Sequence, residues 1–220
     1  GVKVVAQGVS GSVVYGVRNL SAAPRIEECE ITASSTGSGS IAYGVSFKNY
    51  FAGARSTIRR SEIAVSGANT SYGVSMLDGL TLNELRDSRI TVASAVSDYG
   101  IFADVNTSWS GTEYLTIRNA EVTSTGGSSA SDGVFLDAGT SANLEVVVSK
   151  IYGDDYGIYQ GGSGSIGVKS STILGYTGTV VTSGSAAISA TELIGGAASA
   201  SGWLGCMGVW DENATFYSNS

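Results

Sequence analysis

Histidine is absent from this chain of 220 residues, and proline and cysteine are scarce, with one and two residues. Without histidine, the chain has neither a Ser-His or Cys-His catalytic pair nor a His-ligated zinc site. Two cysteines, Cys29 and Cys206, do not make a disulfide framework. No apolar run approaches the ~18 residues that a membrane-spanning helix needs, so we expect no membrane span.

The chain is instead rich in glycine, with 31 residues, and in serine, a composition that taken alone would fit a disordered linker. However, 42% of its residues are hydrophobic and only 14% are charged. That is too much apolar material to leave in water. The length allows one sizeable domain, and we expect the chain to fold.

Charge is unevenly distributed along the chain. Residues 1–118 balance to zero, whereas residues 119–220 hold Lys150 and Lys169 as their basic residues and carry the whole net charge of -7. An acidic half without arginine makes nucleic acid a poor partner, because phosphate contacts need clustered Lys and Arg, and we expect no nucleic-acid binding. The negative electrostatic field of this half suits cations or neutral polar ligands.

A hydrophobic pair recurs seven times with its members five residues apart. The pairs are Ile26/Ile31, Ile58/Ile63, Leu85/Ile90, Ile117/Val122, Val146/Ile151, Val168/Ile173 and Ile188/Leu193. The third residue after the first apolar member is always small: Cys29, Ser61, Ser88, Ala120, Ser149, Ser171 and Thr191. This pattern predicts a buried stack of small side chains at a crowded corner.

A second motif, Tyr-Gly-Val or Tyr-Gly-Ile, alternates with the first. It occurs at Tyr15, Tyr43, Tyr72, Tyr99 and Tyr156, and Asp132 replaces the tyrosine once. Strand alternation around the glycine predicts that Tyr and Val or Ile point inward and Gly outward. The residue before the second apolar member runs Glu30, Glu62, Arg89, Glu121, Lys150, Thr172 and Glu192, which predicts a solvated ladder of charges.

Short β-branched strands, Gly/Ser turns and a repeat of roughly 20 to 33 residues indicate a parallel β-solenoid. Over roughly residues 4–195 the sequence resembles the right-handed parallel β-helix family, whose members often show an Ile-x-x-Ser-x-Ile signature like that of Ile58–Ile63. We therefore expect an all-β, single-stranded, right-handed parallel β-helix of about seven coils over residues 1–195. Because this scaffold hosts lyases, hydrolases, adhesins and tailspikes, the resemblance does not fix an activity.

Residues 196–220 are expected to form a C-terminal cap, because a solenoid must cover its last apolar layer. With the pattern Cys-x-Gly-Val-x-Asp at Cys206–Asp211, this segment resembles the closing segment of many secreted bacterial β-helix proteins of unknown activity, in which a second cysteine often follows. Whether Cys206 is free or pairs beyond residue 220 stays open. The resemblance implies a secreted or cell-surface protein.

An aromatic strip occupies the outward position two residues after the motif glycine on three consecutive coils, at Phe102, Phe135 and Tyr159. Asp104 and Asp137 follow on the same face, and Trp109 lies on the longest insert. Aromatic rings that pack on sugar CH groups, beside carboxylates that accept hydroxyl hydrogen bonds, predict a carbohydrate-binding surface. The alternative is that a loop or a neighbouring subunit covers the strip.

Asp104 and Asp137 are also the candidate catalytic pair, since adjacent coils would hold them roughly 5 Å apart, as in a retaining glycosidase. The family's enzymes carry further Asp together with basic residues on that face, and here the pair lacks them. Asp98, Asp132, Asp154 and Asp155 are candidates for a Ca²⁺ site between coils, with an ordinary solvated corner as the alternative. We expect no other cofactor.

These observations favour a non-enzymatic structural or adhesive module that binds a polysaccharide or a cell-surface glycan. A polysaccharide lyase or glycoside hydrolase, or a fragment of one, is the first alternative. The second is a fibre or tailspike segment that forms a homotrimer rather than a monomer.

Overall fold

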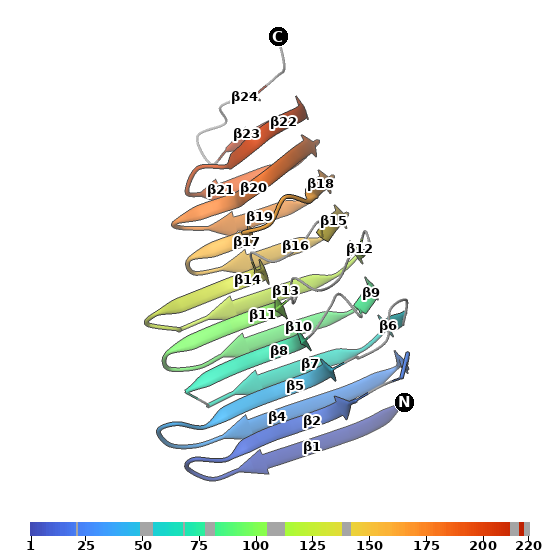
Figure 1. Cartoon of the computed structure of the whole chain (residues 1–220), viewed down its shortest axis with the longest axis vertical. Helices are drawn as coiled ribbons and strands as arrows, with labels where there is room; N and C mark the ends of the chain where they lie inside the picture. The colour runs from blue at the N-terminus through green and yellow to red at the C-terminus, as the bar shows by residue number, and fades with distance from the viewer. Residues whose placement is uncertain are drawn as a thin grey trace.

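The structure, a computed structural model, describes residues 1–20, 22–48, 55–67, 69–77, 82–104, 113–137, 142–211 and 216–217. These residues contain strands and turns but no helix. The strands pair almost entirely in parallel, and through most of the chain each pairs with the third strand after it. Figure 1 shows them stacked along the long axis from the N-terminus to the C-terminus. The all-β class is confirmed, and two large parallel sheets fit a solenoid.

One sheet, here called sheet A, contains ten strands. They are β1 (Val2–Gly8), β4 (Cys29–Ser35), β7 (Glu62–Ser66), β10 (Arg89–Ala93), β13 (Glu121–Thr125), β16 (Lys150–Gly153), β19 (Thr172–Gly175), β21 (Glu192–Gly195), β23 (Val209–Asp211) and β24 (Phe216–Tyr217). Among the described strands only β24 runs antiparallel to its neighbour, β23.

The other sheet has two columns of strands. Column B1 contains β2 (Val13–Asn19), β5 (Ile41–Lys48), β8 (Thr70–Leu77), β11 (Ser97–Asp104), β14 (Ala130–Leu136) and β17 (Tyr156–Gln160). Column B2 contains β3 (Arg25–Glu27), β6 (Ser56–Arg59), β9 (Leu82–Arg86), β12 (Glu113–Arg118), β15 (Ala142–Val147) and β18 (Ser165–Lys169). The long strand β20 (Gly178–Ser189) pairs with β17 through its first half and with β18 through its second, which joins the columns.

The seven predicted hydrophobic pairs bridge the corner between column B2 and sheet A. The second members of successive pairs are in register along sheet A, as for Ile31, Ile63, Ile90 and Val122. These side chains are at most 1% exposed and form the core with the apolar residues of column B1. The predicted small residues are buried at this corner from Ser61 onward, which confirms the buried stack.

The small residues also link the coils by hydrogen bonds. The Ser88 hydroxyl accepts a bond from the Ser61 amide at 3.1 Å and donates to the Arg86 carbonyl at 2.7 Å. Ser149 and Ser171 repeat this arrangement. Serine at this position therefore satisfies backbone groups that the turn would otherwise leave buried without partners.

The residue before each small residue has a left-handed backbone, with φ between 46° and 55°. These residues are Glu28, Arg60, Asp87, Asn119, Val148, Ser170 and Ala190. Asparagine and aspartate tolerate this region well, whereas a β-branched residue is strained there. Val148 is therefore the least suited of the seven.

Replacing Val148 with Asn should raise the free energy of unfolding by about 1 kcal/mol, because it relieves this backbone strain. Val148 is 56% exposed, so little packing is lost. Urea unfolding would measure the change, with Ser170→Val expected to shift stability in the opposite direction. An unchanged or lower stability of Val148→Asn would contradict the assignment of strain.

The predicted charge ladder lies on the outer face of sheet A. Glu62, Arg89, Glu121 and Lys150 are in register on consecutive strands, and Arg89 pairs with Glu121 at 3.0 Å. Both side chains are exposed, so such a pair contributes at most ~1 kcal/mol.

Parallel pairing continues beyond residue 195. β22 (Ser199–Met207) pairs with β20, and β23 pairs with β21. The antiparallel β24 then covers the outer edge of β23, which shields an edge that could otherwise pair with another chain.

Candidate functional site

Four tyrosines form a stack on the outer face of column B1, here called the tyrosine column. Tyr15, Tyr43, Tyr72 and Tyr99 have ring centroids 4.9, 4.9 and 5.3 Å apart, and adjacent rings are within 13° of parallel. Burial, and then the neighbouring phenols, raise the pKa of Tyr43 to about 12. The hydroxyl of Tyr43 therefore stays protonated at neutral pH.

The prediction that these tyrosines point inward and the glycines outward is wrong. A Cβ placed on Gly44 would lie 2.4 Å from Ile63 Cγ2, in the core, and 2.6 Å from the Gly73 carbonyl oxygen. The glycines thus face the interior, where a side chain would not fit between column B1 and sheet A. The tyrosine before each glycine consequently lies on the opposite face, half-buried.

The predicted aromatic strip lies beside the tyrosine column. Phe102, Phe135 and Tyr159 occupy equivalent positions of β11, β14 and β17, with ring centroids 5.6 and 5.0 Å apart. The Phe102 ring contacts Tyr72 and Tyr99 edge-on, with centroids 5.1 Å away in both cases. The three residues form one half-buried column, here called the aromatic strip.

The stacking determines which part of each ring a ligand can reach. Adjacent rings of a column are nearly parallel, with centroids 4.9 to 5.6 Å apart, so each ring face is partly occupied by its neighbour. Together the half-buried rings offer apolar contact along a continuous ridge rather than a series of separate flat platforms.

Carboxylates border the strip, as predicted. Asp104 is exposed at the end of β11, and Asp137 follows β14 and is half-buried. The Asp137 amide donates to the Ala103 carbonyl at 2.9 Å, which places Asp137 beside the end of β11. Trp109, the remaining predicted sugar contact, lies outside the described residues.

The four aspartates of the predicted calcium site lie near the turns that enter column B1. Asp154 accepts bonds from the Gly126 amide at 2.8 Å and the Tyr152 hydroxyl at 2.5 Å. Asp155 accepts a bond from the Ser131 amide at 3.0 Å, and Asp132 one from the Tyr156 amide at 3.2 Å. These aspartates therefore tie turns of adjacent coils together.

Asp98 is fully buried, and among the described residues neither of its carboxylate oxygens has a partner at full hydrogen-bond geometry. Burial raises its pKa, and the nearby Ser94 and Gly127 only partly oppose this. Within the part of the chain that the structure describes, no three acidic or cysteine side chains lie close enough to hold a metal ion. Calcium binding stays a prediction, and a calcium-dependent rise in melting temperature would test it.

Asp132 occupies the position at which the tyrosine column lacks a ring. It is in register with Tyr99 and only 2% exposed. Burial, opposed by the hydrogen bond from the Tyr156 amide and reinforced by Asp155, raises its pKa to about 7. Asp132 therefore changes its charge near neutral pH, within an aromatic face.

No protein-family model, curated protein or solved structure matches this chain. The described residues include no helix that is long and apolar enough to cross a membrane.

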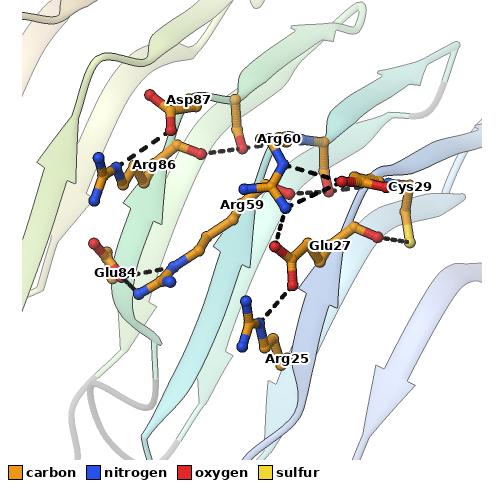
Figure 2. A network of polar contacts seen from close by, with 11 residues as sticks. Arg25, Glu27, Cys29, Arg59, Arg60, Glu84, Arg86 and Asp87 are labelled. Atoms are coloured by element: carbon orange, nitrogen blue, oxygen red, sulfur yellow. Dashed lines mark hydrogen bonds and ion pairs between the residues drawn. The ribbon is translucent and has the colours of Figure 1, made fainter. Parts of the chain in front are cut away.

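A network of ion pairs covers the neighbouring face of column B2 (Figure 2). Arg60 pairs with Glu27 and with Glu28, Arg59 pairs with Glu84, and Arg86 pairs with Asp87 at 3.2 Å. Arg59, Arg86 and Arg118 are stacked in register on β6, β9 and β12. Because acids of the same face pair with these arginines, the network is internally balanced and offers a ligand little net charge.

Sequence reasoning did not identify this network, nor the buried position of Asp132 within the aromatic face. The arginine column was detectable, because Arg59, Arg86 and Arg118 each follow the first member of a hydrophobic pair. The signal for Asp132 was its replacement of tyrosine in the second motif.

Proposed function

We propose that this chain is a non-enzymatic binding module of the secreted or cell-surface type, which binds carbohydrate on the outer face of column B1. In this proposal the three stacks of strands form a right-handed parallel β-helix of about seven coils. Its rigid face presents the same kinds of side chain to successive units of an extended glycan.

The observation that carries the proposal is the aromatic strip of Phe102, Phe135 and Tyr159, bordered by Asp104 and Asp137. Half-buried rings in contact with one another are held in place by the fold, so a ligand need not order them. The ridge supplies apolar contact for sugar CH groups, and the carboxylates accept hydrogen bonds from sugar hydroxyls.

Binding is favoured over cleavage because the strands that carry the aromatic strip supply no basic side chain to this part of the face. The strands β11, β14 and β17 contain neither lysine nor arginine. Cleavage of a polysaccharide would require a positive group or positioned hydrogen-bond donors to stabilise the negative charge that develops in the transition state.

The combined replacement of Phe102, Phe135 and Tyr159 by Ala should abolish binding on a glycan array, because it removes the apolar ridge. The matched control replaces Tyr114 and Tyr176, which are 60% and 64% exposed on other parts of the surface, and should leave binding unchanged. Melting curves of both variants would verify that they fold. The proposal fails if the unmodified chain binds no glycan, or if the triple variant folds and binds as well as the parent.

Release of reducing sugar or of unsaturated product by the unmodified chain would instead favour the enzymatic alternative. In that case Asp104→Asn and Asp137→Asn should each abolish turnover.

A further inference from the structure

Negative charge is concentrated around the aromatic strip. Asp104 and Asp137 follow its rings along the strands, and Asp154 and Asp155 precede β17. Asp132 adds to them when it ionises. Since β11, β14 and β17 lack basic residues, this part of column B1 differs from sheet A and column B2, where acids and bases pair.

These carboxylates also raise the pKa values of tyrosines on the same face. Burial is the largest cause of the raised pKa of Tyr99, and Asp132, Asp137, Asp155 and Asp98 add to it. Asp104 acts in the same way on Tyr72, after burial and Tyr99. The causes of both shifts include no lysine or arginine. The strip is therefore bordered by carboxylates on a surface of low polarity, and Lys48 of β5, in register with Asp104 through Leu77, lies two strands away from β11.

The first coil shows that the tyrosine column accepts a cation. Arg18 lies over the Tyr15 ring, with its guanidinium carbon 4.8 Å from the ring centroid. Arg18 also occupies, in register, the position that Phe102 and Phe135 fill farther along. At this position the chain's own Arg18 therefore makes a cation–π contact with a ring of the tyrosine column.

We infer that the glycan recognised by this face is cationic, a polymer of hexosamine units with free amino groups. This inference rests on the proposed carbohydrate binding and names the class of ligand. Ammonium groups of successive sugars would pair with Asp104 and Asp137, which adjacent strands hold about 4.8 Å apart along the backbone. The aromatic strip would contact the apolar faces or edges of the same sugars.

The test compares two oligomers of equal length, one fully deacetylated and one fully N-acetylated. At about pH 5.5 the amines are protonated and ordinary carboxylates are ionised. Calorimetric titration should show the deacetylated oligomer binding at least tenfold more tightly, with an affinity that falls as salt is added. Asp104→Asn combined with Asp137→Asn should weaken its binding about tenfold, since two partly exposed ion pairs are removed. Glu121→Gln combined with Glu192→Gln, on sheet A, is the matched control and should have no effect.

Each contrary outcome has a distinct meaning. Equal or tighter binding of the N-acetylated oligomer would overturn the cationic ligand and leave the proposed carbohydrate binding intact. If neither oligomer binds but the array shows binding of other glycans, the cationic ligand is likewise overturned and carbohydrate binding stands. Absence of binding to any glycan would overturn both proposals. Equal affinity for a lysine oligomer of matched charge would overturn the glycan as the specific occupant.

Discussion

Replacing Gly73 with alanine should destabilise the protein by about 3 kcal/mol or more, although it adds only one methyl group. A Cβ at this position would lie 2.3 Å from Ile90 Cγ2 and 2.5 Å from the Gly100 carbonyl oxygen. The first atom belongs to a fully buried core side chain and the second to the backbone of the next coil, so neither can move without disturbing its own neighbours.

Gly167→Ala is the matched control, because it also introduces alanine on a strand. A Cβ there would meet only the Leu144 carbonyl oxygen, at 3.9 Å. Alanine should be neutral or slightly stabilising at this position, since it reduces the freedom of the unfolded chain. Urea unfolding of the two variants should therefore differ widely. Similar stabilities would show that the glycines of column B1 do not face the core.

Replacing Asp132 with Asn should stabilise the protein at pH 8 and weaken the dependence of its stability on pH. The folded pKa of Asp132 is about 7, above the unfolded value near 3.9, so the folded protein holds the extra proton between these values. Its stabilising contribution is complete below about pH 4 and is lost as pH rises through about 7. A shift of this size corresponds to a few kcal/mol, or several degrees in melting temperature.

Asparagine keeps the oxygen that accepts the Tyr156 amide bond, so the substitution isolates the effect of charge. Melting temperatures from about pH 4 to 8 should fall for the parent as pH rises, and fall less for Asp132→Asn. The residual slope would include the contribution of Asp98, whose pKa burial also raises. Val148→Asn, which removes no titratable group at an exposed position, should leave the slope unchanged. Identical slopes for the parent and Asp132→Asn would contradict the burial of this group.

The repeat pattern predicted the features that depend on like residues stacking on like residues. The pair Ile58 and Ile63 located the corner between column B2 and sheet A. A small residue repeated between two buried apolar residues indicates a tight turn in which a larger side chain would not fit. The order of charges from Glu62 to Lys150, and the register of Phe102 with Phe135, followed from the same equivalence of coils.

The orientation of the tyrosine column was not predictable by simple alternation. Ala42 and Gly44 face inward as alternation requires, but Val45, immediately after the glycine, is also fully buried. The strand thus changes its inward face at the glycine, and such a local irregularity leaves no signal in a pattern of period two. Pairings such as Arg60 with Glu27 depend on side-chain reach across coils, which strand spacing alone does not specify.

The most direct test of carbohydrate binding on column B1 is hydroxyl-radical footprinting with and without a bound glycan. Protection should appear at Tyr72, Phe102, Phe135 and Tyr159, while Tyr152 and Tyr176, on or next to sheet A, should react as before. Protection confined to sheet A or column B2, or none on column B1 at saturating ligand, would contradict the proposed site.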